Sequence, residues 1–193
     1  MYGMVNMAVR DLVLSRFGEA TWQRICEKAG LESTEFVPLQ AYPDKVTYSL
    51  VGSASEHLGV TPDQLLRSFG EHWVRYTADG GYGVLMDMFG RDFRSCLGNL
   101  DRMHNHMGAM MPELVPPRFT VEDRSAHEIR VHYWSEREGL APMVVGLLEG
   151  LARKFGDTVT IVHHPKGTDA DHDMFDRSEE HTSELQSPCN LVC

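Results

Sequence analysis

The sequence lacks the features that mark membrane, secreted and nucleic-acid-binding proteins. No run comes near the roughly 18 consecutive apolar residues that a membrane-spanning helix needs. The N-terminal segment, MYGMVNMAVRDLVLSRFG, has no basic start and no small-residue cleavage site, so it does not resemble a signal peptide. The formal net charge of -10 is opposite to the basic surface that nucleic acids require. We therefore expect a cytoplasmic protein that binds neither nucleic acid nor membrane.

Cysteine is scarce once the end of the chain is set aside. Residues 177–187, RSEEHTSELQS, match the frame translation of a common sequencing-library adapter. We therefore expect residues 177–193 to be an artefactual, disordered tail and residues 1–176 to form a single domain; a natural polar tail is the alternative. Only Cys26 and Cys96 then remain. Without a CxxC pair, they predict neither a disulfide framework nor a zinc knuckle.

Helical patterns dominate the first two-thirds of the chain, and alternating patterns follow. Thr61-Pro62 is a helix start with an N-cap residue and proline at the first helical position. Gly80, Gly81 and Gly83 predict a turn. The predicted helices are residues 3–17, 21–29, 43–58, 62–76, 89–111 and 139–155, and the predicted strands are 119–123, 128–135, 157–164 and 171–175. This order predicts an α+β domain, a mainly helical N-terminal part followed by a small four-stranded antiparallel sheet with an inserted helix.

Two histidines lie close together in LDRMHNHMGAMMP, residues 100–112. At about 100° per residue, His104 falls in the apolar stripe of a helix, whereas His106 projects to the polar side. Two ligands on one helix need a spacing of three or four residues, so the pair cannot share a metal ion. His104 keeps two interpretations. It is either a core histidine bonded to a backbone carbonyl or the axial ligand of a flat apolar cofactor.

A second candidate site lies in HYWSEREGL, residues 132–140. On a strand, Tyr133 and Ser135 point to one face, and Arg137 continues the same parity. Two hydroxyls and a guanidinium on one face suit a pair of carboxylates or a phosphate. The alternative is a surface strand that ends in a helix cap.

These motifs together resemble the heme-nitric oxide/oxygen-binding (H-NOX) family. The resemblance rests on NLDRMH, PPRF and Tyr133-x-Ser135-x-Arg137 in this order, with MYGMVN at the start and GYGVLMDMFG before the histidine helix. It covers about residues 1–175 and extends to the heme domain of the soluble guanylate cyclase β subunit and to bacterial stand-alone relatives. It implies heme b between helices and a four-stranded sheet, with His104 as the axial iron ligand. It also implies that Tyr133, Ser135 and Arg137 bind the heme propionates and that Pro117 presses on the porphyrin.

The resemblance also implies which gases bind. Oxygen-binding members carry a tyrosine three residues before a glycine in the helix after the YxSxR motif. Counted back from Gly146, this position is Met143, which cannot donate a hydrogen bond. Val5, Val9 and Trp73 are expected on the same, distal side, and the Trp73 indole N–H is the one possible donor among them.

The function implied is that of a sensor rather than an enzyme. It would bind NO and CO, exclude O₂, and signal through loss of the bond between iron and His104. The implied partner is a histidine kinase or a cyclic-di-GMP enzyme.

The C-terminal part departs from some relatives and leaves two alternatives. Where those relatives hold a structural zinc with cysteines, this chain has Pro165 and Asp173, so no zinc is expected there. The adapter-like segment begins where the last strand of the family would continue, which predicts a truncated edge strand.

One alternative function is a metal-dependent hydrolase, and the other is the same fold without heme, acting as a scaffold or interaction module. The hydrolase would use a cluster that we otherwise expect to be a solvated loop, formed by His163, His164, His172, Asp169, Asp171 and Asp173.

Overall fold

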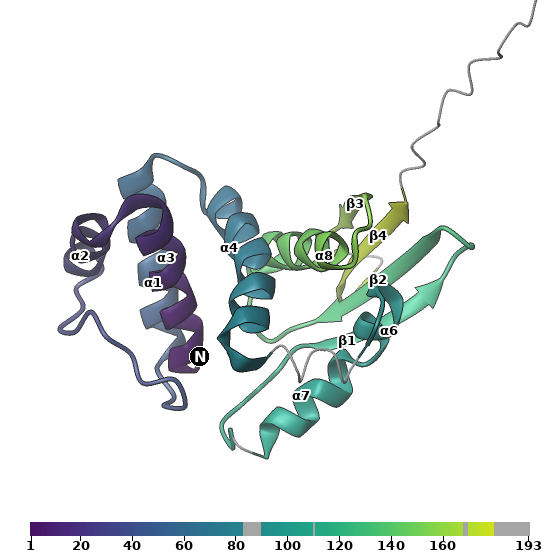
Figure 1. The fold of residues 1–193 in the computed structure, drawn as a ribbon, viewed down its shortest axis with the longest axis horizontal. Helices are drawn as coiled ribbons and strands as arrows, with labels where there is room; N and C mark the ends of the chain where they lie inside the picture. Colours follow the sequence, from purple (N-terminus) through teal and green to yellow (C-terminus); the bar gives the residue numbers. More distant parts are fainter. Residues whose placement is uncertain (83–89, 110, 168–169, 180–193) are drawn as a thin grey trace, which may run out of the picture.

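The computed structural model describes residues 1–82, 90–109, 111–167 and 170–179 (Figure 1). The helical elements are α1 (Gly3–Phe17), α2 (Glu19–Lys28), α3 (Asp44–Leu58), α4 (Pro62–Thr77), the π-helical turn η1 (Ala78–Tyr82), α6 (Phe93–Gly98), α7 (Leu100–Gly108) and α8 (Ala141–Phe155). The strands are β1 (Arg118–Asp123), β2 (Glu128–Trp134), β3 (Val159–His164) and β4 (Asp173–Glu179). Among the described helices, none is both long and apolar enough to cross a membrane.

The four strands form one antiparallel sheet in the order β1-β2-β4-β3. Mainly helical structure followed by such a sheet, with α8 inserted, confirms the predicted fold class. Alternation along β2 buries Ile129, Val131 and Tyr133 on the inner face. Arg130 lies on the other face, where it donates from Nε and Nη2 to Asp176 of β4, each at 2.6 Å.

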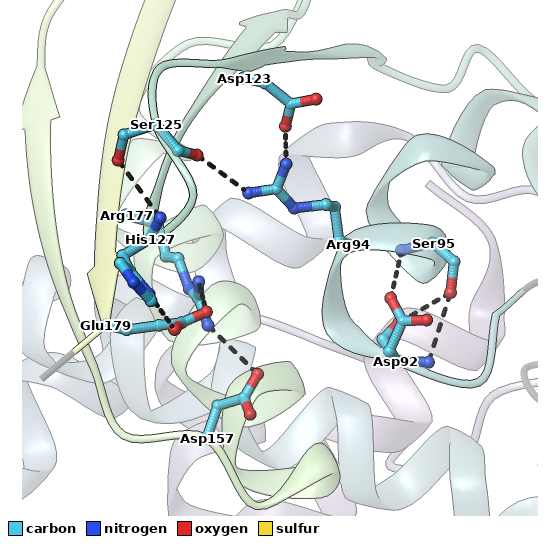
Figure 2. A network of polar contacts seen from close by, with 9 residues as sticks. All are labelled: Asp92, Arg94, Ser95, Asp123, Ser125, His127, Asp157, Arg177 and Glu179. Atoms are coloured by element: carbon cyan, nitrogen blue, oxygen red, sulfur yellow. Dashed lines mark hydrogen bonds and ion pairs between the residues drawn. The ribbon is translucent and has the colours of Figure 1, made fainter. Parts of the chain in front are cut away.

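The structure extends β4 past the predicted domain end at residue 176. Arg177 has the same strand parity as Phe175, so its side chain points inward and is only 3% exposed. Its guanidinium donates to Glu179 at 2.6 Å and to Asp157 at 3.1 Å, and these ion pairs offset the cost of burial (Figure 2). Residues 177–179 are therefore part of the sheet, and the rest of the predicted tail lies outside the described residues. β4 is also an inner strand, not the edge strand that we expected.

The apolar side chains form two cores. The four helices α1 to α4 and the sheet, which carry these cores, lie toward opposite ends of the molecule (Figure 1). We call the two cores the helical core, within α1 to α4, and the sheet core, between the sheet and the helices α6 and α8. Full burial of each large apolar side chain stabilises the fold by about 1.5–3 kcal/mol. The helical core includes Val9, Leu12, Trp22, Ile25, Leu50 and Phe69. The sheet core includes Phe93, Leu97, Val131, Leu148 and Phe175.

Helices α4 and α8 cross between the two cores, and glycines allow their backbones to touch. A Cβ atom added at Gly146 would lie 1.9 Å from the carbonyl oxygen of Arg67. One added at Gly70 would lie 2.1 Å from the carbonyl oxygen of Met143. Any side chain at either position would force the helices apart. This crossing fixes how the helical core sits against the sheet core.

The single helix predicted over residues 89–111 is wrong, because the structure contains two helices there. α6 begins after Asp92, whose carboxylate accepts the Ser95 backbone N–H at 2.8 Å. It ends at Gly98, and Asn99 separates it from α7 with φ -104° and ψ 4°. Glycine and asparagine favour helix ends over helix interiors. The predicted start at Phe89 lies outside the described residues, and the predicted glycine turn is instead η1, with Gly83 outside the described residues.

Candidate heme-binding site

A cavity of about 300 Å³ lies between the two cores, and almost all of its wall is apolar. Val5 of α1, Trp73 of α4 and Met143 of α8 line it, as the sequence predicts, together with Leu97 of α6 and Met107 of α7. Val9 does not line it, because this side chain is buried in the helical core. The cavity therefore borders five helices and can take a flat apolar molecule.

His104 contributes an imidazole to the cavity wall from α7. Its Nδ1 atom is buried and has no hydrogen-bond partner among the described residues. Burial lowers the pKa of His104, and this effect exceeds the opposing influence of the Asp101 carboxylate and the Pro117 carbonyl. The imidazole is therefore neutral near pH 7, which is the form that binds a metal. His106 is exposed, as its helical position predicts.

Helix α7 is held at its start by one polar contact with the sheet. The Asp101 carboxylate, in the first turn, accepts the backbone N–H of Phe119 in β1 at 2.8 Å. The inner face of α7 forms part of the cavity wall, with Leu100, Met103, His104 and Met107. The helix that carries His104 is therefore attached to the sheet at a defined point beside the cavity.

The Tyr133, Ser135 and Arg137 side chains all line the cavity. Only Tyr133 lies on β2, because the strand ends at Trp134, one residue before its predicted end at Ser135. Burial raises the pKa of Tyr133. This effect is larger than the opposite effect of the hydrogen bond with Ser135. The Ser135 hydroxyl accepts the Arg137 backbone N–H at 3.0 Å, which fixes the turn that brings the guanidinium back to the cavity.

The Arg137 guanidinium joins three distant segments. Its Nε donates to the Asp44 carboxylate at 2.8 Å, and its Nη1 donates to the Val115 carbonyl at 2.7 Å. The other oxygen of Asp44 accepts from the N-terminal ammonium of Met1 at 2.5 Å. Burial acts to raise the pKa of Asp44, but the hydrogen bonds from Met1 and Arg137 outweigh it and the pKa is lowered. Asp44 is thus charged at neutral pH and orients the guanidinium.

The distal residues offer few hydrogen-bond donors. Met143 and Val5 have none in their side chains. The Thr77 hydroxyl, which also lines the cavity, already donates to the Trp73 carbonyl at 2.8 Å. The Trp73 ring lies edge-on to Phe69, with 6.0 Å between the ring centroids.

The C-terminal histidines each meet a different carboxylate. His163 contacts Asp173 at 2.7 Å and His164 contacts Asp176 at 2.8 Å. His172 contacts Asp171 at 2.6 Å. Within the described ranges, no group of three or more such side chains could hold a metal ion, and Asp169 lies outside those ranges. The geometry therefore gives no support to the hydrolase alternative.

Comparison with known proteins assigns the family. The model of the Haem-NO-binding family matches residues 2–163. The chain belongs to this family. Soluble guanylate cyclase gcy-32 of Caenorhabditis elegans is 30% identical over 186 residues, 94% of this chain and 27% of that protein. Soluble guanylate cyclase 89Db of Drosophila melanogaster is 26% identical over 155 residues, 80% of this chain and 23% of that protein. The H-NOX chain thus spans about a quarter of the length of these relatives.

Solved structures share the fold of this H-NOX domain. An H-NOX protein from S. oneidensis in the Fe(II)NO ligation state has a TM-score of 0.82 and 25% identity, covering 93% of this chain and 99% of that chain. The unliganded Fe(II) H-NOX protein from K. algicida has a TM-score of 0.82 and 22% identity, covering 96% of this chain and 100% of that chain. The family is one of heme-based gas sensors.

The residues of this H-NOX domain fit a heme. The cavity offers apolar walls, one neutral imidazole whose Nδ1 is buried without a partner, and a cation flanked by two hydroxyls. These groups suit the macrocycle, its iron and its two carboxylates, respectively. Sequence reasoning missed Asp44, Tyr2 and Asp101, which position the site. Each is an isolated polar residue at a helix start, and its partner lies far away in the sequence.

Proposed function

We propose that this domain is a gas sensor that binds NO and CO at heme b, excludes O₂, and signals to a separate effector. The observation that carries the proposal is a single neutral imidazole, His104, in the wall of an apolar cavity that has Met143 at the predicted distal position. When bound, the heme would supply a ferrous iron that takes a diatomic ligand, and His104 would be the residue that holds this iron.

The domain's own side chains would hold and shape this group. His104 would ligate the iron, because its burial keeps the imidazole unprotonated. Tyr133, Ser135 and Arg137 would bind the two carboxylates through two hydroxyls and a charged guanidinium. Pro117, also in the wall, would press on the ring.

Ligand selectivity would follow from the lack of a donor at position 143. O₂ becomes partly negative when it binds ferrous iron, so its retention depends on a hydrogen-bond donor. Met143 supplies none, and the Thr77 hydroxyl is already bonded to a backbone carbonyl. NO and CO are less polarised and do not need the donor. The domain therefore favours NO and CO over O₂.

Signalling would use the way in which α7 is attached. His104, by holding the iron, would give this helix an attachment in addition to the contact between Asp101 and Phe119. Loss of that attachment lets α7 shift about its anchor at Asp101, which is a two-state change biased by the ligand. We propose a histidine kinase or a cyclic-di-GMP enzyme as the effector that detects the shift.

An absorption spectrum of the heme-loaded protein tests the proposal. We expect a Soret band that shifts with NO and with CO and stays unchanged when the ferrous protein meets air. His104→Gly should abolish the wild-type band, and His106→Gly should keep it, because that side chain is exposed. An unchanged spectrum in His104→Gly would contradict the assignment.

Two further outcomes test the exclusion of O₂ and the uptake of heme separately. A stable O₂-dependent spectrum would overturn the exclusion of O₂, and its loss in Trp73→Phe would identify the indole as the donor. Failure of the folded protein to take up heme would leave the heme-free scaffold as the remaining function.

A further inference from the structure

Tyr2 connects the start of α1 to the segment that follows α7. Its hydroxyl accepts the backbone N–H of Glu113 at 3.0 Å, across 111 positions of sequence. The ring is only 6% exposed and lines the cavity. Losing this hydroxyl would leave the Glu113 N–H without this partner.

The segment after α7 is bonded to the end of that helix. The Met111 N–H donates to the Met107 carbonyl at 3.0 Å, and the Leu114 N–H donates to the Met111 carbonyl at 2.9 Å. Met111 is 2% exposed and lines the cavity. A displacement of α7 would therefore pull on the segment that contains Glu113 through these two backbone hydrogen bonds.

The first turn of α1 cannot absorb such a displacement locally. The Gly3 N–H donates to the Gln40 carbonyl at 2.8 Å, and the Met4 N–H donates to the Pro38 carbonyl at 3.0 Å. A Cβ at Gly3 would lie 2.0 Å from the Val37 carbonyl oxygen, so this backbone is in close contact with its neighbour. A displacement of Tyr2 would therefore also displace α1 and the loop at residues 37–40, which is bonded to the first turn of this helix.

We propose that Tyr2 is a positioning residue that couples the His104 helix to the helical core. The inference rests on the proposed function, because it names the route by which the shift of α7 reaches the rest of the molecule. Asp101 attaches one end of α7 to the sheet core, and Tyr2 attaches the other end to the helical core. The helix that carries His104 is thus attached to the sheet core at its start and, through the segment that follows it, to the helical core.

The test uses Tyr2→Phe, which removes the hydroxyl and keeps the buried ring. The matched control is Tyr42→Phe, whose hydroxyl likewise accepts a backbone N–H, that of Val37 at 3.1 Å, away from the cavity. In the ferrous protein without NO, the Glu113 amide should exchange with deuterium roughly 3- to 10-fold faster in Tyr2→Phe and at the wild-type rate in Tyr42→Phe. Unchanged exchange of Glu113 in Tyr2→Phe would show that the hydroxyl is not the attachment.

The coupling is tested by adding NO and following the Gly3 and Met4 amides. In the wild type, NO should change their exchange rates together with those of α7. In Tyr2→Phe, the change in α7 should persist and the change at Gly3 and Met4 should be lost. A merely structural role would shift the baseline but keep the NO response of α1, and that result would overturn the proposal. If NO changes nothing in the wild type, the proposed function fails, and the attachment is decided by the measurement without NO.

Discussion

Two histidines in the same short helix illustrate how burial decides chemistry at the scale of single residues. Burial lowers the pKa of His104, whereas His106 lies in solvent two positions away. Helical periodicity alone predicted this difference, because each residue advances by about 100° around the axis. The partners of Arg137 could not be predicted in this way. Asp44 and the N-terminal amine reach it through tertiary folding, which a local pattern does not encode.

Asp176 gives a pH-dependent test at the same scale. Its hydrogen bonds from Arg130 lower its pKa to about 2; burial opposes the shift and a bond from His164 adds to it. A carboxyl group with a lowered pKa stabilises the fold above its ordinary pKa of 3.8, and this contribution is lost as the pH falls toward about 2. The urea midpoint of the wild type should therefore exceed that of Asp176→Asn by a constant amount above about pH 5.

Below about pH 4 this difference should shrink, and it should vanish below about pH 2, where the Asp176 carboxyl is protonated and both side chains are uncharged. Glu32→Gln, at an exposed loop position, is the control and should follow the wild type throughout. A difference that does not vary with pH would show that the ion pair with Arg130 adds nothing to stability.

Secondary-structure elements were predictable where their ends carry local signals. α4 begins at a capping box formed by Thr61 and Gln64, and the predicted start at Pro62 matches the structure. The break between α6 and α7 escaped prediction because the apolar spacing of Leu97, Leu100 and His104 continues across Asn99. Periodicity reports which side chains face inward, and it does not register a change of helix axis between them. The capping box formed by Asp92 and Ser95 is also a local signal, and it marks the start of α6 in the sequence.

The crossing of α4 and α8 depends on glycine and gives a prediction at the scale of elements. Gly146→Ala places a methyl group 1.9 Å from the Arg67 carbonyl oxygen, so the helices must separate. We expect the free energy of unfolding to fall by about 1–3 kcal/mol, as for other overpacked sites. Chemical denaturation of both proteins measures the change.

Gly52→Ala is the matched control, since Gly52 lies within α3 and a Cβ there meets nothing within 4 Å. Alanine should stabilise this helix by about 0.5–1 kcal/mol, because it loses less conformational entropy on folding than glycine. Equal effects at the two positions would show that the crossing is not in tight contact.

At the scale of the whole molecule, the helical and sheet cores meet at the cavity and are joined by ionic as well as apolar contacts. The sequence predicted both layers, and the resemblance to the family placed Val5, Trp73 and Met143 at the cavity. It placed Val9 in that wall, but α1 turns Val5 toward the cavity and Val9 into the helical core. Which of two inward residues reaches a cavity depends on how whole elements are placed.

The ionic bridge from Met1 through Asp44 to Arg137 predicts a salt-sensitive link between the two cores. Asp44→Asn keeps the shape of the side chain and removes its charge. Because Asp44 is partly exposed, we expect a loss of only about 0.5–1 kcal/mol in unfolding free energy at low salt. The loss should decrease at about 1 M salt, where charges are screened within about 3 Å. A salt-independent loss would show that the contact acts by shape rather than by charge.

The position of β4 has a consequence for the order in which the molecule can be assembled during translation. β4 is the last described strand to be synthesised, yet it lies between β2 and β3. The ribosome releases every helix of the helical core, the β1–β2 hairpin and β3 before residues 173–179 emerge. Until then, one edge of β2 and both edges of β3 are unpaired and open to mispairing with other chains. The helical core can therefore form early on the nascent chain, whereas the sheet is completed last.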